Sequence, residues 1–473
     1  MTTADSTAFV YYRALRLANV KSFIPGTTLD LCIDGRPAPW TLILGENGLG
    51  KTTLLQCLAL LRPTLNVKQS EDTDARTPDR IEPALPEYED DLLRDLARVG
   101  EQLQIELSAD FEIGWSLRSG ARSTHKRQQT TTWAKYTAHE RDFSDFTFSK
   151  VQRPDFRAPL FVAYSAARHA PYRRTDVVSD QEDSTASLFK PEIELIDAVK
   201  VLEDLDHISL REKHDERGTQ RRRGVSIAKG EASSLYDSIR EALATILPEV
   251  EKPERIKVYG PALPGRDNKK TGVWIETYSG EVPLRSLSIG YQTMFAWTVD
   301  LAWRLAEHHK DSRAPLHEAA IVLIDELDLH LHPKWQRRVR RDLSAVFPQV
   351  QFIVTTHSPV LAQTYLDTNI AVVRRDGDHA TIDNDPRVVR SWRLDQVSES
   401  LLHDLNPYSP ELIEAFQTRS TLLAKKRLTP SDRAKLDAAN ALVANVDSDS
   451  NPDDQAAAKL IREAAQLIAT RPK

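Results

Sequence analysis

A glycine-rich stretch, Thr41-Leu-Ile-Leu-Gly45-Glu-Asn-Gly-Leu-Gly50-Lys51-Thr52-Thr53, constrains this chain more than any other part of it. An apolar strand-like run enters the loop, and an apolar helical pattern follows it. Gly45, Gly50, Lys51 and Thr52 fill the pattern G-x-x-x-x-G-K-[ST] completely. Glycines let successive backbone N–H groups point inward, and the following helix adds the positive end of its dipole. The stretch therefore predicts a phosphate-binding loop, with Lys51 reaching the β- and γ-phosphates of a nucleotide and Thr52 offering its hydroxyl to Mg²⁺.

Two later strand-like runs end in polar residues that suit a nucleotide site. Residues 319–324 are apolar and lead into Asp325-Glu326, and residues 350–354 lead toward His357. An acidic pair at the carboxyl end of a central parallel strand is where an α/β sheet presents reactive groups. We expect Asp325 to hold Mg²⁺ through water and Glu326 to polarise the attacking water. His357 would donate a hydrogen bond to a γ-phosphate.

A second anion-binding turn is indicated by the residues that lead up to Gln292. Ser288 and Gly290 stand just before a helical apolar run. A hydroxyl, backbone N–H groups and a helix dipole together attract an anion. An ordinary capped helix has the same local sequence, so the pattern alone leaves both interpretations open.

The order of these motifs resembles the ATP-binding-cassette (ABC) family, specifically its soluble SMC, RecF and OLD-type branch. The runs from Leu323 to Gln336 and from Phe347 to Pro359 look like those of bacterial stand-alone ATPases in anti-phage and retron systems. The Septu ATPase subunit is the nearest family, and the ATPase of PARIS systems is the second. The resemblance implies an α/β fold: an ABC-type P-loop ATPase head, a mixed sheet with helices on both faces, with a helical subdomain and a helical C-terminal region.

The resemblance also assigns roles by position. It makes Asp325 the Walker B acid, Glu326 the catalytic glutamate, Asp328 the D-loop acid and His357 the switch histidine, with Lys51 as a further catalytic residue. Thr52 and Asp325 would hold Mg²⁺. ATP would bind the Walker A loop and the signature turn, which comprise Gly45, Glu46, Asn47, Gly48, Leu49, Gly50, Lys51, Thr52 and Thr53, and then Ser288, Gly290 and Gln292.

The chain departs from the family pattern in three ways. Tyr164-Ser165 stands where a Q-loop glutamine is expected, which leaves the Mg²⁺ and water sensor unassigned. The stretch between Lys51 and Ser288 lacks sustained heptads, which excludes long coiled-coil arms. Asp376-Gly-Asp378 has no suitable preceding glutamate strand for a TOPRIM nuclease, and we interpret it as a hairpin turn.

The composition shifts suggest five segments. They are an ATPase lobe with the Walker A loop (residues 8–65), a partly flexible insertion with a helix and strands (66–157), a helical lid region with a sensing loop and a hairpin (158–283), the part carrying signature, Walker B, D-loop and switch histidine (284–385), and a C-terminal helical interaction region (386–473). Within them we expect strands at 102–111 and 112–117 and helices at 192–205, 233–247, 436–446 and 456–468.

The resemblance implies an ATPase that works as a head-to-tail dimer, because each subunit supplies half of an ATP site. It would control a separately encoded nuclease, an HNH protein in the Septu case or a TOPRIM protein in the PARIS case, with a phage-derived trigger or a change in nucleotide state. The alternative is an ATP-driven clamp that binds DNA or RNA through Arg221–Arg223 and the basic run Arg337–Arg341. A membrane-transporter subunit fits poorly.

Composition limits the partners and the cellular compartment that we expect for this chain. The net charge is −6, which does not point to a nucleic-acid binder, and the two cysteines, Cys32 and Cys57, have no CxxC spacing. We therefore expect a reducing cytoplasm without disulfides. We see no secretion signal, and no apolar run approaches the ~18 residues of a membrane helix. His330 and His332 form a weak metal motif without a third ligand.

Overall fold

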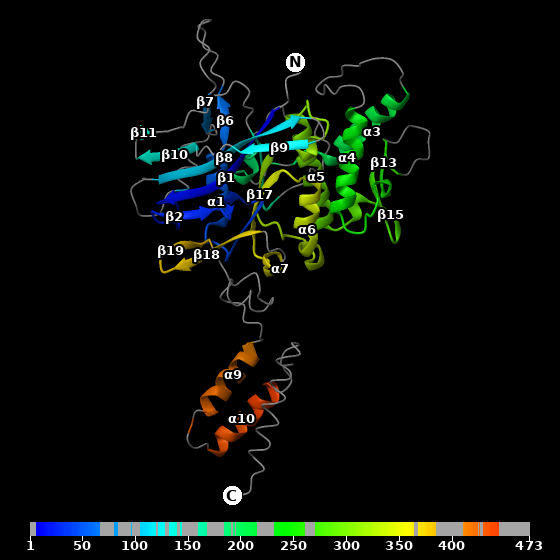
Figure 1. Ribbon diagram of the computed structural model, residues 1–473. Helices are drawn as coiled ribbons and strands as arrows, with labels where there is room; N and C mark the ends of the chain where they lie inside the picture. The colour runs from blue at the N-terminus through cyan, green and yellow to red at the C-terminus, as the bar shows by residue number, and fades with distance from the viewer. Residues whose placement is uncertain are drawn as a thin grey trace. The chain divides into compact units, whose positions relative to one another are not determined.

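The computed structural model shows an α/β core built on one mixed sheet, followed by a separate helical unit (Figure 1). The chain divides into two compact units, Met1–Val397 and Ser398–Lys473. The structure describes residues 6–66, 80–83, 96, 105–119, 122–127, 132–139, 142–143, 159–167, 184–190, 193, 195–214, 231–260, 270–363, 368–384, 410–423, 425 and 429–443.

The central sheet has the strand order β12-β16-β17-β5-β18-β19. The first five strands of this order are parallel to their neighbours, and β19 is antiparallel to β18, so the predicted mixed sheet is confirmed. The strands β12, β16, β17 and β5 are buried along their whole length, which is why they are near-continuous apolar runs in the sequence. Their bounds are β5 (Trp40–Gly45), β12 (Leu160–Tyr164), β16 (Ala320–Ile324), β17 (Val350–Thr356), β18 (Asn369–Asp376) and β19 (His379–Asp383).

A second sheet is antiparallel, and its strands come partly before and partly after the phosphate loop in the sequence. Its order is β11-β10-β8-β1-β2, and β9 also pairs with β8. The two strands expected at 102–111 and 112–117 are wrong, because β8 runs unbroken from Ile105 to Ser119 along nearly all of β1. The bounds are β1 (Ser6–Ala18), β2 (Thr27–Asp30), β8 (Ile105–Ser119), β9 (Arg122–Arg127), β10 (Thr132–His139) and β11 (Asp142–Phe143). Of the short helix expected in this insertion, at residues 91–96, only Leu96 is among the described residues.

Smaller sheets complete the strand inventory. A three-stranded antiparallel sheet combines β13 (Ile256–Tyr259), β14 (Gly272–Thr277) and β15 (Gly280–Pro283). Two-stranded pairs form between β3 (Cys32–Ile33) and β4 (Arg36–Pro37) and between β6 (Pro63–Asn66) and β7 (Arg80–Pro83). The hairpin β18–β19 turns at Gly377, whose φ is +60°, as expected for the turn at Asp376-Gly-Asp378.

The helices of the first unit pack beside one another and against the central sheet. The helix expected at 192–205 begins later, at Ala198, because Asp197 Oδ1 accepts hydrogen bonds from the Val199 and Lys200 N–H groups and caps it there. The bounds are α1 (Lys51–Leu60), α3 (Ala198–His214), α4 (Glu231–Ile246), α5 (Ile289–His308), α6 (Pro333–Val346) and α7 (Pro359–Ala362). Short 3₁₀ turns are η1 (Ala186–Leu188), η2 (Pro253–Arg255), η3 (Leu284–Ser286) and η4 (Pro315–His317).

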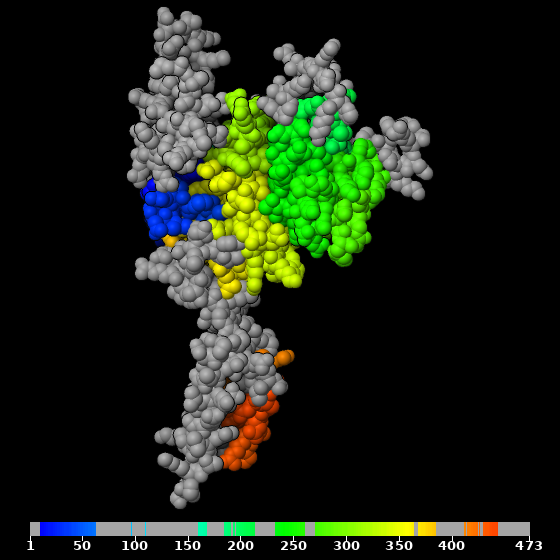
Figure 2. Space-filling model, turned by 45° about the vertical axis from the view of Figure 1, so that its right-hand side comes forward, coloured from blue at the N-terminus to red at the C-terminus, as the bar shows by residue number. Residues whose placement is uncertain are grey.

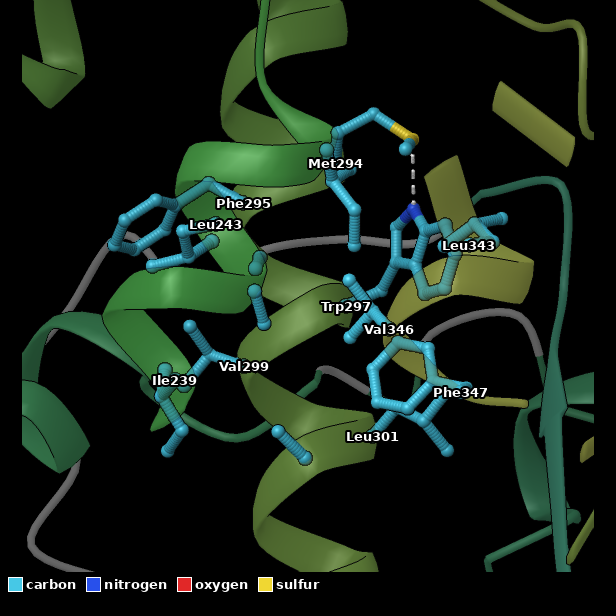
Figure 3. Close-up of a cluster of buried hydrophobic side chains, with 14 of the residues drawn as sticks. Ile239, Leu243, Met294, Phe295, Trp297, Val299, Leu301, Leu343, Val346 and Phe347 are labelled. Atoms are coloured by element: carbon cyan, nitrogen blue, oxygen red, sulfur yellow. Dashed lines mark hydrogen bonds between the residues drawn. The ribbon is translucent and has the colours of Figure 1, made fainter. Parts of the chain in front are cut away.

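A large apolar core joins α4, α5 and α6. Leu243 and Phe295 meet on one side of α5, and Trp297 lies near Leu343 and Phe347 on the other (Figure 3). The Trp297 indole N–H points at Met294 Sδ, 3.1 Å away. In the space-filling view the green surface of α3, α4 and the β13–β15 sheet adjoins the yellow surface of the central part (Figure 2). The core thereby fixes α5 and α6 on one face of the sheet.

The second unit contains a pair of packed helices, α9 (Pro410–Leu423) and α10 (Pro430–Val443). Thr429 and Asp432 cap α10 reciprocally: Asp432 N–H donates to Thr429 Oγ1 and Thr429 N–H donates to Asp432 Oδ2, each at 3.1 Å. The helix expected at 436–446 therefore starts earlier, and the one at 456–468 lies outside the described residues. No helix in the described part of the chain is both long and apolar enough to span a bilayer.

Candidate functional site

The predicted site residues gather where the parallel strands of the central sheet end. β5, β16 and β17 run in the same direction, so the residues after Gly45, Ile324 and Thr356 emerge at the same edge. β12 lies beside β16 and ends at Tyr164, with Ser165 following. The strand order thus brings together residues that are hundreds of positions apart in the sequence.

The loop between β5 and α1 leaves a helix N-terminus open to an anion. Gly50 caps α1 in the left-handed conformation, at φ +94°, without a side-chain hydrogen bond. A Cβ at Gly50 would lie 2.8 Å from the Phe23 ring, so glycine is required here for space as well as conformation. Phe23 itself is fully buried beside the loop. Of the remaining predicted loop residues, Asn47 and Gly48 are exposed, Glu46 and Leu49 are half-buried, and Thr53 is buried.

Lys51 folds back onto the loop that it follows. Its Nζ donates hydrogen bonds to the carbonyl oxygens of Gly45 at 2.9 Å and Glu46 at 2.8 Å. Burial lowers the pKa of Lys51 to about 8, and the nearby carboxylates of Asp325 and Glu326 oppose that shift only in part. A phosphate group would give this ammonium a stronger partner than two neutral carbonyls.

Asp325 joins the loop to the β16 edge. Thr52 Oγ1 donates to Asp325 Oδ2 at 2.9 Å, and Thr355 Oγ1 donates to Asp325 Oδ1 at 2.5 Å. Asp325 is buried, with 6% of the residue exposed. A hydroxyl and a carboxylate at a phosphate loop are the few hard oxygen ligands that Mg²⁺ takes from a protein when phosphates supply others, so these residues fit the ion.

Glu326 adopts an unusual backbone conformation directly after the buried strand. Its φ is +49°, a left-handed value that is costly for a non-glycine residue. The Glu326 N–H donates to Thr355 Oγ1 at 2.8 Å, which holds the turn in this conformation. The chain therefore turns away from the direction of β16 at Glu326, whose side chain is half-buried at the edge of the sheet.

Asp328 and His357 are held together by the backbone end of β17. The Asp328 carboxylate accepts from Thr356 Oγ1 at 2.5 Å and from the His357 N–H at 3.3 Å. Burial, and then the charge of Lys51, lower the pKa of the His357 imidazole below its ordinary value, which favours the neutral ring. Among the described residues, His357 Nε2 and Ser165 Oγ are buried polar atoms without a hydrogen-bond partner. Orphaned polar atoms at this edge are consistent with a ligand site.

The predicted signature turn packs elsewhere within the same chain. Ser288 caps α5 by accepting from the Tyr291 N–H at 3.4 Å, and Gln292 Nε2 donates to the Leu287 carbonyl at 2.7 Å. A Cβ at Gly290 would lie 2.2 Å from the His330 carbonyl oxygen. The turn therefore touches the loop after Asp328, while Ser288 itself is exposed.

Several side chains at this edge carry no sequence motif of their own. Thr355 and Thr356 orient the two aspartates, and only their position at a strand end hinted at a role. Tyr164, at the expected sensing loop, donates its hydroxyl to the fully buried Asp300 at 2.8 Å. Arg304 Nε also donates to Asp300 Oδ2 at 2.8 Å, which compensates the buried charge.

The histidines of the 327–333 turn do not form a metal site in the structure. His332 Nδ1 accepts from the Lys334 N–H at 3.2 Å and so caps α6. Across the described ranges there is no group of three or more His, Cys, Asp or Glu side chains that could hold a metal ion.

The basic face of α6 is partly neutralised within the chain. Arg338 Nε and Arg341 Nη2 both contact the buried Asp342 carboxylate, at 2.5 and 3.1 Å. Arg338 also donates to the Thr245 carbonyl at 3.2 Å. The other basic run expected to contact nucleic acid, Arg221–Arg223, lies outside the described residues.

Comparison with known proteins adds relatives of two kinds. Retron Vc95 probable ATPase of Vibrio cholerae serotype O1 biovar El Tor is 23% identical over 367 residues, which cover 70% of this chain and 68% of that protein. Septu protein PtuA of Bacillus mycoides (strain KBAB4) is 24% identical over 402 residues, 84% of this chain and 45% of that protein. The match thus spans less than half of the PtuA length.

Two solved structures align with most of this chain. The SMC head domain from Thermotoga maritima matches with a TM-score of 0.34 and 13% identity over 79% of this chain and 98% of that one. The recombination mediator protein RecF-ATPrS in the RecFOR pathway matches with a TM-score of 0.35 and 13% identity over the same shares of the two chains.

A family model described as "AAA domain, putative AbiEii toxin, Type IV TA system" matches residues 41–362. That range begins in β5, ends in α7 and includes the phosphate loop, the Ser288 turn, Asp325, Glu326 and His357. The chain belongs to this family and is a P-loop ATPase.

Proposed function

We propose that two copies of this chain bind ATP head to tail, with the Gly45–Thr53 loop of one copy facing the Ser288 turn of the other. The hydrogen bond between Thr52 Oγ1 and Asp325 Oδ2 carries the nucleotide half of this proposal, because it unites motifs 273 residues apart at one sheet edge. The exposed Ser288 supports the second half, since its hydroxyl accepts from the Tyr291 N–H but can still donate its hydrogen to another molecule.

Within each site the side chains divide the work. Lys51 exchanges its two carbonyl partners for β- and γ-phosphate oxygens, and the loop N–H groups bind the same phosphates. Thr52 and Asp325 would hold Mg²⁺, which when bound would supply positive charge to offset the charge of the phosphates. Glu326 orients the attacking water and accepts its proton, while neutral His357 donates from Nε2 to the γ-phosphate. Asp328 holds the His357 backbone in register.

We further propose that this ATP cycle controls a separately encoded nuclease in bacterial anti-phage defence. The similarity to a retron ATPase and to Septu protein PtuA supports this role. An HNH or a TOPRIM protein is the proposed effector class. Co-purification of this chain with the product of a neighbouring nuclease gene tests the pairing, and a chain that recovers no such nuclease contradicts it.

The substitution Glu326→Gln tests the assigned chemistry. It preserves side-chain size but removes the proton acceptor, so we expect ATP turnover to fall by about 10²–10⁴-fold while nucleotide affinity stays near that of the parent. Steady-state phosphate release and binding of a fluorescent ATP analogue measure the two quantities. Glu307→Gln, an exposed acid on α5, is the matched control. Parental turnover in Glu326→Gln would remove Glu326 from the mechanism.

The alternative, an ATP-driven clamp on DNA or RNA, draws less support. Two of the arginines it would use on α6 already contact Asp342. Salt-dependent DNA binding by the isolated chain would reverse this preference.

A further inference from the structure

Gln336, on the first turn of α6, lies between two segments of the ATP site, the 328–331 loop and the residues after β17, and has no role assigned to it above. Its Nε2 donates to the Leu331 carbonyl at 2.9 Å and to the Asp328 carbonyl at 3.4 Å. Its Oε1 accepts from Ser358 Oγ at 2.6 Å. The residue is 9% exposed, so these hydrogen bonds stand in place of bonds to water.

The contacts of Gln336 close a ring through the site edge. Ser358 N–H donates to Thr356 Oγ1 at 3.0 Å, and Thr356 Oγ1 donates in turn to the Asp328 carboxylate at 2.5 Å. The Asp328 backbone carbonyl then returns to Gln336. Asp328 is a member of this ring, and its carboxylate also accepts from the His357 N–H at 3.3 Å, so the ring connects both residues to the 328–331 loop.

The 328–331 loop is also the surface against which the Ser288 turn rests. Position 290 admits no Cβ because the His330 carbonyl oxygen would lie 2.2 Å from it, and His330 itself has a φ of +65°. Packing this close transmits a displacement of the loop directly to the first turn of α5. The chain thus has a continuous contact path from His357 through Gln336 to Gly290.

We propose that Gln336 is a positioning residue that holds the 328–331 loop against the end of β17. Through this loop, the γ-phosphate side of a subunit's own ATP site, at Asp328 and His357, sets the position of the Ser288 turn of the same subunit. The inference rests on the proposed function, in which Ser288 serves the partner's ATP. Gln336 touches neither nucleotide nor reacting water in this role. Gln336 couples the ATP site on the phosphate loop of its own subunit to the ATP site of the partner, which the Ser288 turn completes.

A purely structural role for Gln336 makes a different prediction. If the side chain only fills space and satisfies α6, then an unbranched apolar substitute should reduce stability and leave turnover per folded molecule unchanged. A positioning role instead changes kcat while leaving nucleotide affinity intact, because the hydrogen bonds of Gln336 go to Asp328, Leu331 and Ser358 and not to residues 45–53.

The experiment compares Gln336→Met and Gln336→Glu with the parent. Methionine retains length and volume but loses all three hydrogen bonds, while glutamate retains the acceptor for Ser358 and loses both donors to the loop. We expect kcat to fall by about tenfold to a hundredfold in both variants, as for other displaced positioning groups, with KM and the affinity for a fluorescent ATP analogue near parental. Lys334→Gln, an exposed position on the same turn of α6, is the control and should match the parent.

Amide hydrogen exchange provides a readout that does not depend on hydrolysis. The Leu329 and Leu331 N–H groups donate to the Glu326 and Asp328 carbonyls, so their exchange reports on the loop directly. In nucleotide-free protein we expect faster exchange at 329–331 and at 290–292 in both Gln336 variants, with β16 and β17 unchanged. If the parent protein does not hydrolyse ATP, the proposed function is wrong. The hydrogen-exchange comparison would still test whether Gln336 positions the 328–331 loop. Parental kcat in Gln336→Glu, or parental exchange at 329–331 in both variants, overturns the inference.

Discussion

Lys51 illustrates how one buried charge is prepared for a ligand. The ammonium is held by two neutral carbonyls, and burial lowers its pKa to about 8. Its unfolded-state pKa is higher, so the folded free protein releases this proton as the pH rises through about 8. A phosphate partner favours the charged form and restores the higher value.

This shift predicts a pH-dependent affinity for ATP. Above about pH 8, binding must return a proton to Lys51, so affinity should fall by up to about tenfold per pH unit and stay level below that pH. Fluorescent-nucleotide titrations between about pH 7 and about pH 9.5 measure the effect. Lys51→Arg keeps its charge throughout this range and should bind with a flat profile. An equal decline in Lys51→Arg would assign the effect to another group.

Gly290 is a second residue whose identity the packing dictates. Gly290→Ala must displace the His330 carbonyl, and we expect a loss of about 1–3 kcal/mol in unfolding free energy together with reduced ATP turnover. Gly260→Ala is the control, since a Cβ there meets nothing within 4 Å. Denaturant unfolding of the two variants gives the comparison, and equal stabilities would mean that the loop relaxes freely.

At the scale of elements, the signature helix and the sheet edge share a buried polar link. Asp300 on α5 is fully buried and accepts from Tyr164 at the end of β12, from Arg304, and at 3.4 Å from the Ile196 N–H. The Tyr164 carbonyl accepts from the Asp325 N–H at 2.9 Å, so the same residue touches the acidic strand. α5 is therefore attached to the nucleotide edge through Tyr164 as well as through the loop at His330.

Removing one hydroxyl tests this link between helix and strand. Tyr164→Phe leaves a buried carboxylate short of one donor, so we expect unfolding free energy to drop by about 1–3 kcal/mol. Tyr259→Phe removes a hydroxyl that bonds to the half-exposed Glu281, and its effect should stay within about 0.5 kcal/mol. Thermal or urea unfolding distinguishes the two, and a neutral Tyr164→Phe would show that Arg304 and the Ile196 N–H together satisfy Asp300.

At the scale of the whole molecule, the composite site predicts complementation between defective copies. Lys51→Ala spoils the loop and Ser288→Arg blocks the turn, so each variant alone should be inactive. A mixed dimer regains one intact site, and an equimolar mixture should recover about a quarter of the parental turnover if both sites act independently and pairing is random. Phosphate release from the mixture measures this recovery. Failure of the mixture to exceed either variant would contradict head-to-tail pairing.

The sequence by itself determined the phosphate loop and the character of the central strands. The glycine spacing from Gly45 to Thr52 reflects local backbone geometry, and the apolar runs of β5, β16 and β17 reflect burial on both faces. These are local properties that a single segment shows, whereas the mixed α/β fold was expected from the resemblance of the motif order to a known family. The element boundaries that depend on contacts with other residues were not predicted. β8 is continuous because it pairs with β1 along its length, and α3 starts where Asp197 caps it.

Only the tertiary structure decided which residues meet. Strand order brings Thr52 to Asp325, β17 supplies Thr355 and Thr356 to the aspartates, and α6 brings Gln336 between Asp328 and Ser358. Hydrogen bonds of this kind join residues of ordinary type over long sequence distances, so no periodicity or spacing encodes them. The sequence thus specified a loop able to bind phosphate, and the packing of the chain specified the network around it.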